Sequence, residues 1–392
     1  MSGLLEGIRV LDLSRILAGP WCGMTLGDLG ADVVKVERPG SGDDTRHWGP
    51  PFTESGQSAY FLCANRNKRG ITLDFGCDAG KELLGRLIAS ADVVIENFRA
   101  GTLAKWGFDW ERLTNLRPDI VYCTITGFGY DNEFSREPGY DMLLQARGGL
   151  MSITGPEDGP PHKVGVALCD VVTGLNASNA ILAALVARAR KQSPQRIDIS
   201  LFDSQVTMLA NVASNYLVSG ERPVSYGNAH PSIVPYQAFD ASDGALAVGV
   251  GNDAQWSRLC AEIGEPGWAT DVRFATNAAR VESRHELIPL LATVFAGRSR
   301  LEWTEALERL SIPCAPIQHI DEVFADPRAL ARGLRQEVDG VPLTASPLRI
   351  PTSPVSVRRA PPKLGEHTRE VLEDWLGFDQ GAVERLVADG VV

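Results

Sequence analysis

The chain has 392 residues, of which 44% are hydrophobic and 22% are charged, and its net charge is −11. This composition is typical of a globular protein that is long enough for two domains. The net negative charge argues against nucleic acid as a partner, because proteins that bind nucleic acid need a basic face to neutralise phosphates.

The sequence shows no clear pattern of a membrane span, a signal peptide or paired cysteines. We expect no apolar run of the roughly 18 residues that a bilayer span needs, and the N-terminus lacks the charged and apolar regions of a signal peptide. The sequence therefore predicts a cytoplasmic protein without a membrane partner. Seven cysteines form no CxxC pair, which predicts free thiols and neither a metal site nor a disulfide framework.

The N-terminal segment predicts a βαβ unit. Residues 8–13 and 32–37 read as strands, and the helix between them is opened by Pro20 and carries Gly23 and Gly27 on one face. We expect these glycines to let the helix approach the sheet closely. The GxGxxG fingerprint of nicotinamide and flavin enzymes is missing from this unit.

The strand and helix pattern then repeats. Further strands are expected at residues 70–74, 92–96, 119–125 and 196–200, with helical patterns such as residues 79–90 between them. This alternation predicts a parallel sheet that is covered on both faces. Ligands of such sheets bind beyond the carboxyl ends of the strands.

Basic side chains gather in the segments that follow the predicted strands. They are Arg38, Arg46, Arg66, Lys68, Arg69, Arg99 and Lys105. Singly, each is typical of a solvated surface. Together they are suited to a ligand with several phosphates, with Phe98 or Trp48 as a stacking face, in either an enzyme or a binding module.

One carboxylate stands apart from the surface charges. Asp170 lies between apolar neighbours in residues 165–174, just before a helical pattern over residues 175–188. We expect it at a helix N-terminus, where backbone N–H groups and the helix dipole favour an ionised group. There it either caps the helix or attacks an electrophile.

The pattern of predicted elements changes in the second half of the chain. A helical run to about residue 217 is followed by a loop rich in proline, strands at residues 237–240 and 245–250, and helices near 254–263, 285–295 and 301–310. This pattern predicts a smaller α+β domain. We place the large domain at residues 1–221, the small domain at 222–328, and a return to the large domain at 329–392, which ends in a helical pair.

Motifs along nearly the whole chain carry a family resemblance. They are the Leu-Ala-Gly-Pro run at 17–20, residues 37–43, 67–69, 96–98 and 139–141, Asp170 with Thr173-Gly174, and residues 364–368. In this order they resemble the class III CoA-transferases, the family of formyl-CoA transferase. Residues 48–51, 153–157 and 232–239 are most similar to the succinate-hydroxymethylglutarate CoA-transferase branch of that family. The resemblance implies a Rossmann-like large domain built from both chain ends, a smaller α+β domain and an interlocked homodimer.

The resemblance also implies an activity. CoA would move from an acyl-CoA donor, expected to be succinyl-CoA, to a carboxylic acid acceptor, expected to be a dicarboxylate. Asp170 matches the family's nucleophile, which forms mixed anhydrides and an aspartyl-CoA thioester. Coenzyme A is then a co-substrate, and neither a permanently bound cofactor nor a metal is expected.

Matching positions imply the contacts to CoA. They are Ala18, Arg38, Leu73, Asn97, Phe98, Arg99, Lys105 and Tyr140, with Lys105 standing where formyl-CoA transferase has arginine. Two departures predict a different acceptor: Leu17 replaces a glutamine, and residues 228–236 replace a glycine-rich loop. Candidates for the cation that binds a distal carboxylate are Arg15, Arg46, Arg66 and His230, with Trp48 as a further substrate contact.

Two other functions are compatible with the same fold. An α-methylacyl-CoA racemase needs an acid and a base beside the α-carbon, but the family's racemases have histidine where this chain has Tyr140. A CoA-binding protein without turnover would not need a nucleophile, and the presence of Asp170 argues against it.

Overall fold

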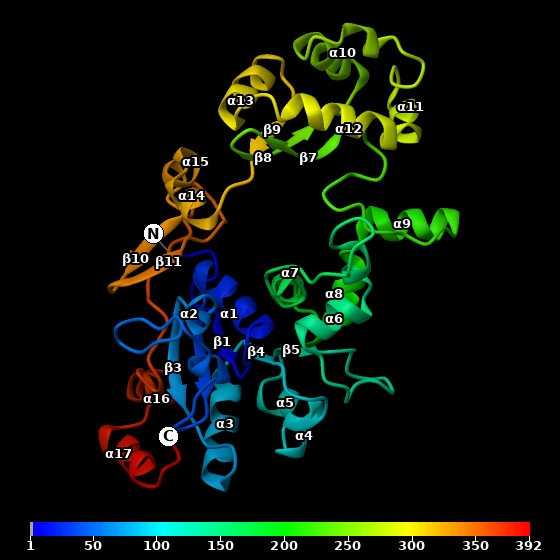
Figure 1. The fold of residues 1–392 in the computed structure, drawn as a ribbon. Coiled ribbons are helices and arrows are strands. Elements are labelled where there is room, and N and C mark those ends of the chain that lie inside the picture. Colours follow the sequence, from blue (N-terminus) through cyan, green and yellow to red (C-terminus); the bar gives the residue numbers. More distant parts are fainter. Residues whose placement is uncertain (1–2) are drawn as a thin grey trace. The chain divides into compact units, whose positions relative to one another are not determined.

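The computed structural model describes residues 3–392, which form two compact units (Figure 1). The first unit comprises the chain up to residue 150 together with residues 164–220 and 327–392. The second comprises residues 151–163 and 221–326. Residues 151–163, which the sequence analysis left in the large domain, therefore belong to the smaller unit.

The first unit is built on a parallel sheet of six strands. In chain order these are β1 (Arg9–Asp12), β2 (Asp32–Glu37), β3 (Lys68–Thr72), β4 (Val93–Glu96), β5 (Val121–Thr126) and β6 (Gln195–Ser200). Their spatial order is β3-β2-β1-β4-β5-β6, and every pairing is parallel. The predicted parallel sheet is confirmed. The strand order reverses between β1 and β4, so the loops after these two strands flank the usual binding crevice of a Rossmann-like sheet.

Alternate residues of the strands face two separate cores. Val10 and Ile95 pack with α1 (Ala18–Asp28) and α7 (Leu168–Ala189) on one face. The other face, which includes Leu11, packs against helices that come from both halves of the chain. These helices are α3 (Asp78–Ser90), α5 (Trp110–Leu116), α16 (Thr368–Leu376) and α17 (Gln380–Ala388). The C-terminal helical pair therefore completes the core of the first unit.

Two glycines allow close contacts on the α1 face. A Cβ atom at Gly174 in α7 would lie 2.6 Å from the carbonyl oxygen of Ala18 in α1. A Cβ atom at Gly23 would lie 2.8 Å from a carboxylate oxygen of Asp12. Both distances are shorter than a real Cβ contact, so a side chain at Gly174 would push α7 away from α1, and one at Gly23 would push α1 away from β1. The predicted close approach of α1 to the sheet is confirmed at Gly23.

Helix α7 corrects the expectation that no apolar run reaches the length of a bilayer span. Among residues 3–392 it is the helix that is long and apolar enough, by length and composition alone, to cross a bilayer. Ala177 and Ile181 are buried in the core of the first unit. Packing against α1 and the sheet accounts for the apolar composition of this helix.

Several short elements were not predicted in the first unit. They are α2 (Ala59–Leu62), α4 (Thr102–Lys105), α6 (Asp141–Arg147) and two 3₁₀ turns, η1 (Asp44–His47) and η2 (Leu150–Ile153). Turn η2 begins in the first unit, and its residues 151–153 belong to the second. The expected helix from residue 201 is divided into α8 (Leu201–Thr207) and α9 (Ala210–Ser219). Ala210 has a φ of +43°, which interrupts the helical run.

The second unit has a three-stranded antiparallel sheet. Its strands are β7 (Tyr236–Ala241), β8 (Gly244–Gly249) and β9 (Cys314–Pro316). Its helices are α10 (Asp253–Glu262), α11 (Asn277–Glu282), α12 (Arg284–Phe295), α13 (Arg300–Arg309) and α14 (Ile320–Ala325), with the 3₁₀ turn η3 (Pro266–Ala269). The predicted hairpin and three of these helices are confirmed. The sequence analysis missed β9 and the short helices α11 and α14.

The C-terminal return begins with α15 (Pro327–Ala331) and a hairpin of β10 (Arg335–Val338) and β11 (Val341–Thr344), which forms a sheet of its own. The chain then runs back to the main sheet. The N–H of Asn67 donates to the carbonyl of Arg359 (3.0 Å), and the N–H of Asp74 donates to that of Val391 (2.9 Å). These bonds fix the C-terminal segment beside β3.

Two buried ion pairs lie beneath the loop that joins β1 to α1. Lys68 Nζ is 2.9 Å from Asp12 Oδ2, and Lys35 Nζ is 2.9 Å from Asp43 Oδ2. None of the four side chains is exposed to solvent. Burial alone would raise the pKa of Asp12, but the ammonium groups of Lys68 and Lys35 hold that pKa below its usual value. Lys68 is therefore structural, which corrects its place among the ligand-binding cations.

The same ion pairs fix the backbone of the loop. Lys35 donates to the carbonyl of Ser14 (2.9 Å), and the N–H of Ile16 donates to both carboxylate oxygens of Asp43 (3.3 and 3.2 Å). Ile16 has a φ of +70°. For a β-branched residue this left-handed backbone conformation costs about 1–3 kcal/mol of free energy. The buried pairs therefore stabilise a strained loop directly before α1.

We predict that Lys68→Met lowers the free energy of unfolding by about 3–5 kcal/mol, because it leaves the Asp12 carboxylate buried without its partner. The double variant Asp12→Asn with Lys68→Met should recover most of this loss, since no uncompensated charge remains. Chemical denaturation of the four proteins in a double-mutant cycle measures both effects. Equal instability of the single and double variants would show that the pair is not the cause.

Candidate active site

The loops after β1 and β4 are joined at the point where the strand order reverses. Arg15 N–H donates to Asn97 Oδ1 (2.8 Å), and Asn97 Nδ2 donates to the carbonyl of Arg15 (2.7 Å). Beneath them, Glu96 accepts from the N–H of Phe98 (2.6 Å) and from the hydroxyl of Tyr122 (2.9 Å). Burial raises the pKa of Glu96 to about 7. Asn97 is thus a structural link between the two loops that border the crevice.

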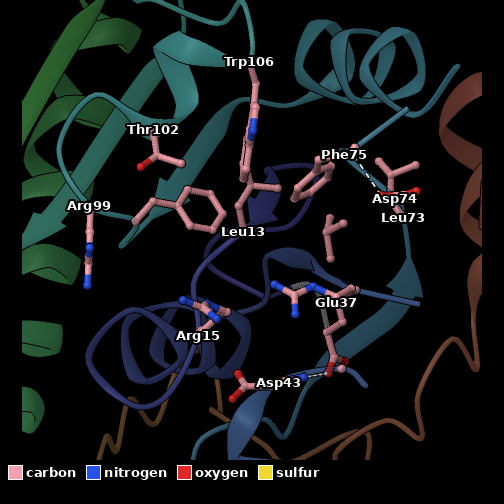
Figure 2. A pocket seen from close by; sticks show the side chains of 15 residues that line it. Leu13, Arg15, Glu37, Asp43, Leu73, Asp74, Phe75, Arg99, Thr102 and Trp106 are labelled. Atoms are coloured by element: carbon pink, nitrogen blue, oxygen red, sulfur yellow. Dashed lines mark hydrogen bonds between the residues drawn. The ribbon is translucent and has the colours of Figure 1, made fainter. Parts of the chain in front are cut away.

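A cavity of about 590 Å³ opens beside these loops (Figure 2). Four of the predicted CoA contacts line it, namely Arg38, Leu73, Phe98 and Arg99. The sequence analysis missed two aromatic residues in the wall, Phe75 and Trp106. The ring centroid of Trp106 lies 5.2 Å from the ring centroids of Phe75 and Phe98. The position of Phe75 shortly after the end of β3 was a signal that could have identified it, whereas Trp106 caps the C-terminus of α4 and gave no such signal.

A second cavity, of about 260 Å³, contains the carboxylate that the sequence singled out. Asp170 lines it together with Ala18, Asn97, Phe98, Arg99 and Tyr140. Arg15, Phe98 and Arg99 line both cavities. Seven of the eight predicted CoA contacts thus lie in the walls of the two cavities. Lys105 is exposed at the end of α4 and lines neither of them.

The capping interpretation of Asp170 is wrong. Helix α7 begins at Leu168, seven residues before the predicted start, and its N-cap residue Ala167 makes no side-chain hydrogen bond. The N–H of Cys169 instead donates to Asp141 Oδ1 (2.9 Å), and Gln145 holds the other oxygen of Asp141 (2.7 Å). Asp141 therefore caps α7 from the neighbouring helix α6. This role left no signal in the local sequence around Asp170.

Asp170 is left without a partner by this arrangement. Within residues 3–392 its carboxylate forms no hydrogen bond and no ion pair, although it is only partly exposed. Burial and then the charge of Asp141 raise the pKa of Asp170 to about 7. The expectation that the helix terminus keeps Asp170 firmly ionised is therefore corrected, because Asp141 occupies the N-terminal donor. A carboxylate that is desolvated and unpaired is a stronger nucleophile than one in water.

An aromatic side chain of α2, that of Tyr60, lies near the same carboxylate. Burial, and then the charge of Asp170, raise the pKa of Tyr60 to about 12. The ring of Trp48 packs edge-on against Tyr60 at 5.0 Å and is 42% exposed. Trp48 is thus connected to the surroundings of Asp170 through Tyr60, and its contact with substrate stays a prediction.

Two of the predicted substrate cations have structural roles. Arg66 is buried and binds both carboxylate oxygens of Asp28 (3.0 and 2.6 Å). Arg46 forms a fork with Glu37 (2.7 Å for each bond) and donates to the carbonyl of Pro362 (3.0 Å). Neither lines the cavity of Asp170. Their guanidinium groups are engaged inside the protein, which corrects both assignments.

The remaining candidate cations differ in position. Arg15 lines the cavity of Asp170, where its Nη1 is 3.1 Å from Asp44 Oδ2. His230 lies in the second unit, where its ring packs edge-on against Tyr236 at 5.5 Å. A substrate role of His230 stays a prediction.

Comparison with known proteins identifies the family. The family model of CoA-transferase family III matches residues 5–368. A succinate–glutarate CoA-transferase from Agrobacterium fabrum is 45% identical over 94% of this chain and 95% of its own length. The succinyl-CoA:glutarate CoA-transferase of Mus musculus is 43% identical over 99% of this chain and 90% of its own length.

A solved structure agrees with this relationship. A CAIB/BAIF family protein from Brucella suis has a TM-score of 0.88 and 46% sequence identity, covering 96% of this chain and 100% of that one. The chain belongs to CoA-transferase family III. It is a class III CoA-transferase, an enzyme that uses CoA thioesters as substrates. The predicted family and enzyme class are confirmed.

We predict that Asp170→Asn stabilises the protein at pH 8. The carboxyl has a pKa of 3.8 when unfolded and about 7 when folded. Its contribution to stability is therefore fully present below about pH 4 and is lost as the pH rises through 7. Replacing it with a neutral amide should raise the free energy of unfolding at pH 8 by on the order of 2–4 kcal/mol.

Thermal unfolding of both proteins between pH 4 and pH 8 measures this difference. The gain of the asparagine variant should shrink steadily as the pH falls. A difference that does not change with pH would show that Asp170 titrates normally.

Proposed function

We propose that this enzyme transfers CoA from succinyl-CoA to a dicarboxylic acid, with glutarate as the first acceptor to test. The names of the relatives from Agrobacterium fabrum and Mus musculus supply the donor and acceptor class. The observation that carries the mechanism is the unpaired carboxylate of Asp170 in the wall of a cavity that adjoins a larger one.

The first half of the reaction transfers CoA to the enzyme. The ionised carboxylate of Asp170 attacks the thioester carbonyl carbon of the donor, the C–S bond breaks, and CoA leaves as a thiolate. The product is a mixed anhydride between Asp170 and the donor acid. The thiolate then attacks the carbonyl carbon of Asp170 and releases the donor acid as its carboxylate, which leaves an aspartyl-CoA thioester.

The second half repeats these steps in the reverse order. The acceptor carboxylate attacks the aspartyl-CoA carbonyl and expels the thiolate, which forms a second mixed anhydride. The thiolate then attacks the acyl carbon of the acceptor, so that the new acyl-CoA leaves and the Asp170 carboxylate is restored. Each attacking group is an anion, so no proton transfer is required once Asp170 is ionised.

The larger cavity is suited to the CoA moiety. Arg38 and Arg99 supply exposed guanidinium groups for phosphates, and the rings of Phe75, Phe98 and Trp106 supply apolar surface. Phe98 and Arg99 border both cavities, so the thiol end of CoA can reach Asp170 while the nucleotide remains in the larger cavity.

We also propose a homodimer. No residue of α9 is buried, and Leu217 and Val218 are 79% and 89% exposed. An isolated amphipathic helix of this length is marginal in water, so a partner surface is expected to cover it. A second copy of the chain, interlocked as in the resemblance above, supplies that surface.

The decisive test of the proposed mechanism is trapping of the aspartyl-CoA thioester. After incubation with succinyl-CoA, hydroxylamine should convert Asp170 into its hydroxamate, which peptide mass spectrometry detects. Asp170→Asn should lose transfer by at least about 10⁴-fold while remaining folded, because it has no attacking anion. Full transfer by this variant, or an adduct on another residue alone, would refute the role of Asp170.

A second prediction concerns Asp141, whose charge contributes to the raised pKa of Asp170. Asp141→Asn keeps an oxygen that can accept from the N–H of Cys169 but removes the charge. The acid limb of the pH profile of kcat/KM should lie near pH 7 in the native enzyme and move to lower pH in this variant.

Asp141→Ala is the matched control, because it removes both the charge and the cap. It should show the same shift of the acid limb together with a lower unfolding temperature. An acid limb that stays in place in both variants would contradict the influence of Asp141 on Asp170.

A further inference from the structure

The cavity of Asp170 contains charges of both signs, but most of them are already paired. Among its lining residues, the carboxylate of Glu137 pairs with Arg147, and that of Asp141 is held by Gln145 and the backbone of Cys169. Asp44 pairs with Arg15. The two guanidinium groups in the wall are those of Arg15 and Arg99.

We propose that Arg15 binds the distal carboxylate of the diacid, and that Asp44 holds its place until the substrate arrives. The inference rests on the proposed function, since only a substrate with a second carboxylate needs such a site. Arg15 Nη1 is 3.1 Å from Asp44 Oδ2, so the wall of the cavity already contains a carboxylate bound to this guanidinium.

The pair is built so that a substrate can replace Asp44. Its side chains are 44% and 54% exposed, in contrast to the buried pairs of Arg46 and Arg66. An exposed ion pair contributes only about 0–1 kcal/mol, so exchanging Asp44 for a substrate carboxylate costs little. A guanidinium fork can bind a carboxylate through two hydrogen bonds.

The backbone of Arg15 is fixed although its side chain is free to change partner. Asn97 binds both its N–H and its carbonyl, and Asp43 binds the N–H of Ile16. The strained loop therefore presents Arg15 at a constant position in the same cavity as Asp170. A cation that is held near the nucleophile selects acids with a second carboxylate over acids with only one.

The symmetry of the reaction extends this role to the donor. In both halves the acyl carbon that reacts with Asp170 lies at the same place, so the succinyl and glutaryl chains extend in the same direction. Arg15 then recognises the distal carboxylate of succinyl-CoA as well as that of the acceptor. One residue would thus select dicarboxylates on both sides of the exchange.

The test is a ratio of specificities. We compare kcat/KM for glutarate with that for pentanoate, which has the same chain length and one carboxylate, in the full-length enzyme with succinyl-CoA as donor. Arg15→Gln should lower the glutarate to pentanoate ratio by about 100-fold or more, because one charge-assisted bidentate contact is lost. Arg15→Lys should recover part of the ratio, since it keeps the charge without the fork.

Arg99→Gln is the matched control, because Arg99 lines the same two cavities without holding a carboxylate. It should lower transfer to both acids by similar factors and leave their ratio within about threefold of the native value. Asp44→Asn should raise the ratio several-fold, because Arg15 then has no internal competitor. Circular dichroism confirms that each variant is folded.

The outcomes separate this inference from the proposed function. An unchanged glutarate to pentanoate ratio in Arg15→Gln, with native transfer to glutarate present, would overturn the role of Arg15 alone. A ratio that collapses in Arg99→Gln and not in Arg15→Gln would assign the distal carboxylate to Arg99. Native enzyme that transfers CoA to no diacid would overturn the proposed function, and the role of Arg15 with it.

Discussion

The structure of the site depends on two ion pairs that are buried under the first loop of the sheet. Lys68 with Asp12 and Lys35 with Asp43 lie without exposed surface between β1, β2, β3 and α1. Buried charges are costly unless they are paired and hydrogen-bonded, and these four satisfy one another and the loop backbone. The stabilisation holds Ile16 in a left-handed conformation that it would otherwise leave. The pairs therefore specify one shape for the loop from which α1 starts.

This loop matters because it lies where the sheet reverses its strand order. The helices that follow β1 and β4, α1 and α4, pack on opposite faces of the sheet, and Asn97 fastens the two intervening loops together. The same geometry places the N-terminal end of α7 at the crevice, because α7 packs closely against α1 through Gly174. Asp170, on the first turn of α7, is thus positioned by helix packing rather than by bonds to its own carboxylate.

Asp141 and Asp170 are neighbouring acidic residues with different roles at the start of α7. Asp141 takes the helix N–H that usually stabilises an acidic side chain in the first turn, and its charge disfavours ionisation of Asp170. Asp170 is therefore desolvated and unpaired, which costs stability once the carboxyl is ionised. The pair of Arg15 with Asp44 is exposed and therefore only weakly stabilising. Asp170 and Arg15 are thus poorly satisfied, while the groups that shape the loop are fully satisfied.

The sequence by itself determined the parallel sheet, the family and seven of the residues that line the two cavities, because strand periodicity and ordered motifs are local properties of the chain. It could not decide which basic side chains face a ligand. Arg46, Arg66 and Lys68 stand in the same kind of segment as Arg38 and Arg99, yet long-range partners such as Asp28 and Pro362 engage the first group inside the protein. The capping of α7 by Asp141 was equally hidden, since its donor lies 28 residues away. Only the tertiary structure decides such questions, because the pairing of a charge depends on which distant segments the fold brings beside it.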